Sequence, residues 1–262
     1  VFILILRRLG NKTKIAKEIQ KYFPTHSIYV EPFFGAGGMF FNKPKVKFNI
    51  VNDMDSDVFN LFQVVSNNYQ ELETAFYQMP IHSELLKHWK ETPPTTQIER
   101  ALFLLLHSNF TFNGYGATIV YGGSKSVVVS QKNAFGEKIA LTNKMLFDVQ
   151  FANFDFRKFL KALMLSDKDV ENALIYCDPP YLGTDDNYKD GFLENDSNDL
   201  FDSLQETGCK WAMSEFNHPF IIEQAKQRNL NVITIGERQN LKNRRTEILV
   251  TNYKKDATLF DF

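Results

Sequence analysis

Short apolar runs recur along the chain, and most are separated by segments whose apolar residues follow a helical period. The apolar runs predict seven strands, at 27–31, 47–51, 147–152, 173–177, 210–214, 231–235 and 247–253. Helical segments are predicted at 13–23, 58–66, 157–165, 196–207 and 219–228. Strands that alternate with helices are typical of an α/β fold with a mostly parallel sheet and helices on both faces.

The last two predicted strands are joined only by a short basic loop, residues 238–245. A parallel connection between neighbouring strands needs a crossover of about a dozen or more residues. We therefore predict that the final strand runs antiparallel to its neighbour.

The pattern changes between residues 70 and 143. Helical stretches at 71–76 and 99–107 are joined by a proline-containing loop at 92–96, and a polar, aromatic segment with turn glycines follows at 108–116. This break in the alternation predicts an inserted, mainly helical subdomain at 70–143. The main domain would then consist of residues 1–69 and 144–262.

Composition and charge are those of an ordinary globular protein: 262 residues, a formal net charge of −1, 44% hydrophobic and 23% charged residues. Cys177 and Cys209 lie in or beside apolar runs, so we expect buried free thiols in a reducing compartment. The sequence has neither a C-x-x-C pair nor two histidines at ligand spacing, so no metal is predicted. No run reaches about 18 apolar residues, and we expect a cytoplasmic protein that does not enter a membrane.

Four residues with a distinctive chemistry, Asp178, Pro179, Pro180 and Tyr181, directly follow the predicted strand 173–177. In an open parallel sheet, ligands bind at the carboxyl ends of the strands. An ionised Asp178 only accepts hydrogen bonds, and the Pro179 carbonyl finds no donor in Pro180, which has no N–H. These two oxygens could accept both hydrogens of an exocyclic amine while Tyr181 stacks on its ring. The alternative is an acidic turn whose prolines stop a helix.

A glycine-rich loop, Pro32-Phe33-Phe34-Gly35-Ala36-Gly37-Gly38, follows the predicted strand 27–31 and leads into a predicted helix start. Strand, glycine loop and helix form the plan of many nucleotide-cofactor sites, because glycine lets the backbone approach a ligand closely. A plain turn between strand and helix is the alternative. Asp53 follows about 20 residues later, where an acid can accept hydrogen bonds from ribose hydroxyls. It could equally cap the helix that comes after it.

Taken together, these motifs resemble the Dam-like family of DNA adenine-N6 methyltransferases, the amino-α group of the D12 class. The family's Glu-Pro-Phe-x-Gly-x-Gly motif is matched at 31–37, its catalytic Asp-Pro-Pro-Tyr at 178–181, and the acid after its second strand at Asp53. Its N-terminal motif, usually Lys-Trp-x-Gly-Gly-Lys, stands at 7–12 in the altered form Arg-Arg-Leu-Gly-Asn-Lys. The resemblance covers nearly the whole chain and implies a Rossmann-like methyltransferase sheet.

The resemblance also implies a reaction, in which S-adenosylmethionine methylates N6 of an adenine flipped out of duplex DNA. Lys12 would meet the methionine end of the cofactor, Asp53 would hold its ribose, and Asp155 and Phe156 would border its adenine. The full set of implied cofactor-binding residues is Arg8, Gly10, Lys12, Glu31, Pro32, Phe33, Phe34, Gly35, Gly37, Asp53, Asp155, Phe156 and Asp178.

The predicted insertion supplies side chains for the DNA. A flipped base leaves a gap in the duplex, and we predict that Phe112 and Tyr115 reach it. Asn109 and Asn113 are candidate base readers, because asparagine pairs with the edge of adenine. Phe110 is predicted to pack in the core instead.

Basic residues suited to phosphate contacts are Lys125, Arg244 and Arg245, although a solvated basic loop is the alternative for the arginines. Ala117 stands where GATC-specific members usually carry arginine, so a target other than GATC is expected. A cognate restriction endonuclease is a candidate partner, and an orphan methylase is the alternative. Other substrates also stay open: N4 of cytosine, and behind it an amine of RNA or protein.

Overall fold

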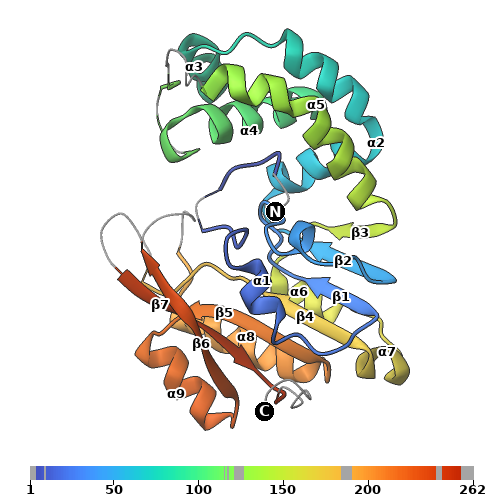
Figure 1. Cartoon of the computed structure of the whole chain (residues 1–262), viewed down its shortest axis with the longest axis vertical. Helices are drawn as coiled ribbons and strands as arrows, with labels where there is room; N and C mark the ends of the chain where they lie inside the picture. The colour runs from blue at the N-terminus through green and yellow to red at the C-terminus, as the bar shows by residue number, and fades with distance from the viewer. Residues whose placement is uncertain are drawn as a thin grey trace. The chain divides into compact units, whose positions relative to one another are not determined.

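The computed structural model describes residues 4–8, 10–114, 116, 118–120, 127–183, 191–239 and 244–254. Within these residues the strands form one seven-stranded sheet in the order β3-β2-β1-β4-β5-β7-β6 (Figure 1). In chain order the strands are β1 (Ile28–Glu31), β2 (Phe48–Asn52), β3 (Val149–Ala152), β4 (Ala173–Cys177), β5 (Lys210–Phe216), β6 (Asn231–Gln239) and β7 (Arg244–Thr251).

The strand directions agree with the predicted mostly parallel α/β sheet. β1 pairs in parallel with β2 and with β4, and β4 pairs in parallel with β5. β7 lies between β5 and β6 and is antiparallel to both, which confirms the prediction for the final strand. The strand order reverses between β1 and β4, so the ligand site of an open α/β sheet is expected where these two strands end.

Most of the predicted helical segments coincide with helices of the structure, but the described residues form more helices than were predicted. The described helices are α1 (Ala16–Gln20), α2 (Ser56–Gln78), α3 (Ser83–Glu91), α4 (Gln97–Phe110), α5 (Val127–Leu146), α6 (Phe156–Lys161), α7 (Asp167–Glu171), α8 (Glu194–Glu206) and α9 (Pro219–Gln227), with 3-10 turns η1 (Phe40–Asn42) and η2 (Phe112–Gly114).

The helix predicted after the glycine loop is wrong, since this segment forms only the single turn η1. The residue before a proline disfavours helical backbone, and Lys43, which precedes Pro44, is extended at φ −111 and ψ 157. The predicted helix at 13–23 is likewise reduced to α1.

Contacts along the chain divide it into two compact units. The first unit comprises residues 1–14, 35–45 and 53–153, and the second comprises 15–34, 46–52 and 154–262. The helices α2 to α5, teal to green in Figure 1, belong to the first unit. The predicted boundary at residue 70 lies inside α2, two residues after a break in its helical backbone at Asn68 (φ −138, ψ 37). The boundaries of the inserted subdomain stay a prediction.

Aromatic stacking holds the helices of the first unit together. The rings of Phe76 in α2 and Phe135 in α5 are stacked with centroids 3.7 Å apart, and Phe110 of α4 lies 6.1 Å from Phe76. Phe110 is fully buried, which confirms its predicted place in the core.

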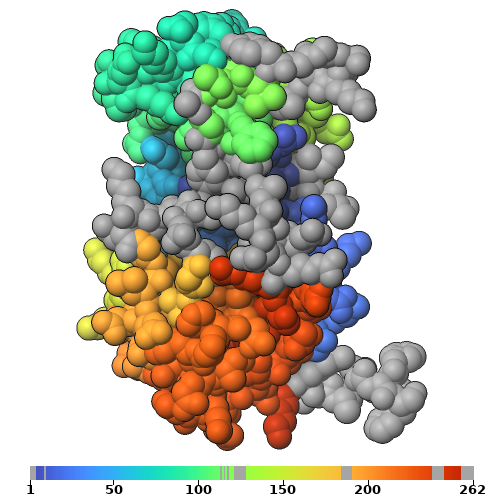
Figure 2. Space-filling model, turned by 90° about the vertical axis from the view of Figure 1, so that its left-hand side faces the viewer, coloured from blue at the N-terminus to red at the C-terminus, as the bar shows by residue number. Residues whose placement is uncertain are grey.

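The second unit has a core built on β1 and β4, in which every residue is buried. Figure 2 shows the segment that begins with α8, in orange, on the surface of this unit. Cys177 and Cys209 are both buried and free, as predicted. None of the helices described has the length and apolarity needed to cross a bilayer.

Candidate active site

Two of the predicted motifs meet at the point where the strand order reverses. Residues 178–181 leave the end of β4, and residues 32–34 leave the end of its parallel neighbour β1. The register of this pair aligns Val30 with Ile175, so both segments emerge at the same edge of the sheet. The sheet therefore gathers the acid-proline-proline-tyrosine motif and the start of the glycine loop within the second unit.

Asp178 is half-buried and Pro179 is buried. Tyr181 is buried, and its hydroxyl donates a hydrogen bond to Glu247 on β7. Its ring meets Phe216 edge-on, with centroids 4.5 Å apart and an interplanar angle of 81°. Burial, followed by the negative charges of Asp178 and Glu247, raises the pKa of Tyr181 well above its ordinary value. Tyr181 is therefore a protonated hydrogen-bond donor at any physiological pH.

The glycine loop of the first unit is held by Asp53. The Gly35 N–H donates to Asp53 Oδ2 at 2.6 Å, and the Asp55 N–H donates to Asp53 Oδ1 at 2.9 Å. Gly35 has a φ of 55° and Gly37 one of 73°, both in the left-handed region that glycine adopts readily. Burial raises the pKa of Asp53, against the opposing charge of Arg8.

The alternative role of Asp53 as a helix cap is wrong. The N-cap of α2 is Asp55, whose side chain accepts from the backbone N–H groups of Asp57 and Val58. A ribose-binding role for Asp53 stays a prediction.

The altered N-terminal motif lies beside the glycine loop within the first unit. A side chain at Gly38 would place its Cβ 2.9 Å from the backbone nitrogen of Lys12, so the two segments are too close for any other residue. Lys12 is buried, and its ammonium group lies 3.4 Å from the carbonyl of Gly10. Arg8 forms an ion pair with Asp55. Lys12 thus lies beside the glycine loop, whereas Arg8 lies beside Asp55 at the start of α2.

A residue to which the sequence assigned no role, Asn52, ties the second unit's part of the site together. Its amide nitrogen donates to the carbonyls of Pro32 and Phe154, each at 2.9 Å. Its amide oxygen accepts from the Phe154 N–H, also at 2.9 Å. The only signal in the sequence is an asparagine at the end of a strand, next to Asp53. Glu31, the last residue of β1, is also buried, and its carboxylate accepts a hydrogen bond from the Tyr29 hydroxyl at 2.7 Å.

Three aromatic rings form a cluster next to this tether. The centroid of Phe156 lies 5.4 Å from that of Phe33 and 6.0 Å from that of Phe192, and Phe33 and Phe192 are 6.3 Å apart. Phe156 is buried, whereas Phe33 and Phe192 are half-buried and keep part of their surface accessible. Phe192 was missed by sequence reasoning, because an isolated aromatic before a helix carries no signal.

Asp155 and Arg157 fix the position of Phe156 between them. Asp155 caps α6 by accepting from the Arg157 N–H at 2.9 Å. The Arg157 guanidinium pairs with Asp155 at 3.2 Å and with Asp199 at 2.7 Å, and also with Asp196. Its Cζ lies 4.4 Å from the centroid of Phe156.

The model of the D12 class N6 adenine-specific DNA methyltransferases matches residues 9–244. The chain belongs to this family. The match includes the glycine loop, Asp53 and residues 178–181, so the D12-class motifs stand where the structure places the site.

Named relatives of this D12-class chain are distant but extensive. A DNA adenine methylase of Haemophilus influenzae is 28% identical over 67% of this chain and 63% of its own length. The type II methyltransferase M1.LlaDCHI of Lactococcus lactis subsp. cremoris is 23% identical over 93% of both chains. The retron Ec67 DNA adenine methylase of Escherichia coli is 27% identical over 84% of this chain and 76% of its own length.

Among the residues predicted to touch DNA, Phe112 and Asn109 have opposite environments in this D12-class protein. Phe112 is 69% exposed. Asn109 is buried, its amide donates to the Ile5 carbonyl at 2.7 Å, and its oxygen accepts from the Arg7 N–H at 3.0 Å. The prediction that Asn109 reads bases is therefore wrong, because its polar atoms are used to anchor the N-terminal segment.

Most of the other residues considered for DNA contacts lie, wholly or with their side chains, outside the part of the chain that the structure describes. The side chains of Asn113 and Arg244, together with Tyr115, Ala117 and Lys125, lie outside the described part of the structure. Arg245 is described: its guanidinium donates to the Gly183 carbonyl at 3.2 Å and lies over the Phe216 ring at 5.3 Å. Phosphate contacts by Lys125, Arg244 and Arg245, base reading by Asn113 and a contact of Tyr115 with the gap in the duplex stay predictions.

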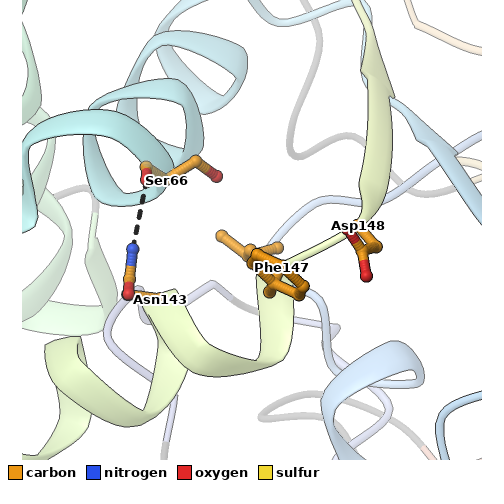
Figure 3. Close-up of a pocket in the computed structure, with 5 residues that line it drawn as sticks. Ser66, Asn143, Phe147 and Asp148 are labelled. Carbon is orange, nitrogen blue, oxygen red and sulfur yellow. Dashed lines mark hydrogen bonds between the residues drawn. The ribbon is translucent and has the colours of Figure 1, made fainter.

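A hollow of about 290 Å³ in the first unit contains none of the predicted site residues. Its lining residues are Ser66, Asn143, Leu146, Phe147 and Asp148. Figure 3 shows the Asn143 amide directed at the Ser66 carbonyl, to which it donates at 3.1 Å. Asn143 also donates to the Val65 carbonyl at 2.8 Å, and so satisfies carbonyls near the break in α2. The Asn143 amide therefore joins α5 to α2. In the described part of the chain no three His, Cys, Asp or Glu side chains gather as a metal site requires.

Proposed function

We propose that this chain transfers a methyl group from S-adenosylmethionine to N6 of an adenine in duplex DNA. The observation that carries the proposal is the position of Asp178 to Tyr181 at the switch point of a D12-class sheet. Ligand sites of open α/β sheets lie there, and this motif is built to hold an aromatic amine. Cytosine N4 carries the same kind of amine and is one outcome of the tests below.

Asp178 and Pro179 act on the amine. The N6 lone pair is delocalised into the purine ring, so the neutral amine is a poor nucleophile. The Asp178 carboxylate and the Pro179 carbonyl accept its two N–H groups, which returns electron density to nitrogen. The carboxylate also lies where positive charge develops on that nitrogen during transfer, and such fixed charges act most strongly in a partly desolvated site. The protein thereby positions and polarises the amine without a covalent intermediate.

The residues present fit a nucleoside cofactor. The rings of Phe33, Phe156 and Phe192 offer a half-buried aromatic surface for a purine. The buried acid Asp53 and the left-handed glycines Gly35 and Gly37 suit a ribose and a close backbone approach. When bound, S-adenosylmethionine supplies an electrophilic methyl group on a positively charged sulfur.

We assign cofactor binding to the residues that the family motifs imply. They are Arg8, Gly10, Lys12, Glu31, Pro32, Phe33, Phe34, Gly35, Gly37, Asp53, Asp155, Phe156 and Asp178. Lys12, as a buried cation, is assigned to the carboxylate end of the methionine portion.

Duplex DNA must release the target base before it can react. Extrusion costs a few kcal/mol, which protein contacts have to offset. Phe112 is exposed and can enter the vacated space, and Tyr181 can stack on the extruded adenine. We assign further DNA contacts to Asn113, Tyr115, Lys125, Arg244 and Arg245. A separately encoded endonuclease is a candidate partner, supported by the type II methyltransferase among the relatives.

The purified protein tests this proposal. It should transfer a labelled methyl group from S-adenosylmethionine to unmethylated bacterial DNA, and nucleoside analysis should find the label in N6-methyladenine. Asp178→Asn keeps the size of the side chain but replaces an acceptor oxygen by a donor. It should lower turnover by roughly a hundredfold or more, as losses of transition-state contacts do. Near-normal turnover in this variant would refute the role of Asp178.

A further inference from the structure

The three residues that end and follow the catalytic motif, residues 181–183, form hydrogen bonds with side chains of β5 and β7. The Tyr181 hydroxyl donates to Glu247 Oε1 on β7. The Leu182 N–H lies 3.4 Å from Glu215 Oε2 at the end of β5. The Gly183 carbonyl accepts from Arg245 at the start of β7. We call Glu215, Arg245 and Glu247 the edge clamp.

The antiparallel register explains why the clamp reaches Tyr181. Glu247 lies directly opposite Phe216 in the β5–β7 pair. Side chains of directly opposed residues share one face of a sheet and lie close together. The ring of Tyr181 therefore meets Phe216 edge-on while its hydroxyl reaches Glu247. One end of Tyr181 is fixed by the backbone after β4 and the other by β7.

The burial of Glu247 makes this contact consequential. Glu247 is only 1% exposed. A buried carboxylate is costly unless donors satisfy it, and the Tyr181 hydroxyl is one such donor. Hydrogen bonds to a charged acceptor are shorter and stronger than those between neutral groups. The contact thus restrains the tyrosine ring much more than apolar packing alone would.

We propose that Glu247 is a positioning residue that acts through the Tyr181 hydroxyl to fix the ring on which the target base stacks. This inference rests on the proposed function, because it gives the ring a place in the reaction. A ring held at both ends keeps one orientation when the extruded base reaches it. A released ring would leave the base amine misaligned with Asp178 and Pro179, and small misplacements of reacting groups lower rates strongly.

A double-mutant cycle tests the proposal with wild type, Tyr181→Phe, Glu247→Ala and the double variant. Glu247→Ala should lower kcat roughly tenfold to a hundredfold, which is the scale of one hydrogen bond to a charged group. It should leave KM for S-adenosylmethionine within about twofold, because the contact lies on the side of the base. In the Tyr181→Phe background it should have little further effect on kcat, because the hydroxyl through which it acts is gone.

Two further variants separate positioning from folding. Glu247→Gln keeps an acceptor oxygen for the hydroxyl but not the charge, and should recover part of the kcat lost in Glu247→Ala. Glu237→Gln changes an exposed carboxylate of the neighbouring strand β6 and should leave kcat unchanged. Equal losses of kcat from Glu247→Ala with and without the Tyr181 hydroxyl would overturn the proposal. A loss of stability with unchanged kcat would also overturn it.

The proposed function is tested separately by the base that the wild-type protein methylates. If that base is cytosine, the same cycle of rate ratios still decides the role of Glu247. Denaturant unfolding of the same four proteins needs no substrate. If the double variant loses less stability than the sum of the losses in the two single variants, the contact is supported. If the losses add fully, the proposal is overturned.

Discussion

Removing the Asn52 side chain should weaken both the fold and the cofactor site. Asn52 is 1% exposed, and its amide makes hydrogen bonds of 2.9 Å to the Pro32 carbonyl, the Phe154 carbonyl and the Phe154 N–H. A buried hydrogen bond contributes about 1 kcal/mol, so Asn52→Ala should lower the free energy of unfolding by about 3 kcal/mol. The two segments it ties carry Phe33 and Phe156, so the affinity for S-adenosylmethionine should fall roughly tenfold, or ~1.4 kcal/mol.

Denaturant unfolding and calorimetric titration of S-adenosylmethionine measure these two effects. Asn49→Ala is the matched control, because Asn49 is also buried on β2 and donates to the Val46 carbonyl at 2.8 Å. It should cost about 1 kcal/mol and leave cofactor affinity unchanged. If Asn52→Ala lost no more stability than Asn49→Ala, or bound the cofactor as wild type does, Asn52 would not be the tether described.

Three other perturbations address neighbouring features. Asn109→Ala removes two hydrogen bonds to the backbone of residues 5 and 7, so thermal unfolding should show a loss of about 2 kcal/mol. The methylated sequence motif should stay unchanged, and an altered motif at normal stability would contradict this. Phe112→Ala should leave stability within about 0.5 kcal/mol but weaken DNA binding in a fluorescence assay. Phe147, which is similarly exposed in the same unit, provides the control, since Phe147→Ala should change neither stability nor DNA binding. Similar DNA affinities for the two variants would refute a DNA contact. Burial raises the pKa of Asp53, so the folded state binds its proton more tightly and stability should fall as pH rises from the unfolded pKa through the folded one. Asp53→Asn should remove that part of the pH slope in acid-range unfolding, and an unchanged slope would contradict the burial argument.

The sheet could be predicted because its signal is local. Apolar runs bounded by turn residues mark each strand, and the short connection between β6 and β7 determines their antiparallel pairing. The catalytic motif and the glycine loop could be placed at the sheet edge for the same reason, since each directly follows a strand.

Helix α5 could not be predicted, because its local signals point elsewhere. It begins with the β-branched run Val127-Val128-Val129 and contains Gly136 in its middle, both of which disfavour helix. Packing explains the glycine: a Cβ at Gly136 would lie 2.4 Å from Glu73 Oε1 and 2.9 Å from the Tyr77 hydroxyl. Glu73 and Tyr77 of α2 would have to move to admit that Cβ, so glycine lets their side chains lie against α5 although local propensity penalises it in a helix.

The roles of Asn52, Phe192 and Glu247 could not be predicted because they depend on contacts distant in sequence. Asn52 bonds to residues 20 and 102 positions away, and Glu247 meets Tyr181 across 66 positions. Asn109 shows the converse error. Its residue type suits adenine recognition, but the fold uses both ends of its amide to hold backbone 102 and 104 positions away.

The most direct test of the central claim is to express the chain in a host that lacks adenine methylation and to map modified bases across the genome by single-molecule sequencing. We expect N6-methyladenine at one short sequence motif, and its absence when the Asp178→Ala variant is expressed to the same level. N4-methylcytosine at a motif would contradict the assignment of adenine. Genomic DNA without any modified base, from cells containing the folded protein, would contradict the proposal that duplex DNA is the substrate.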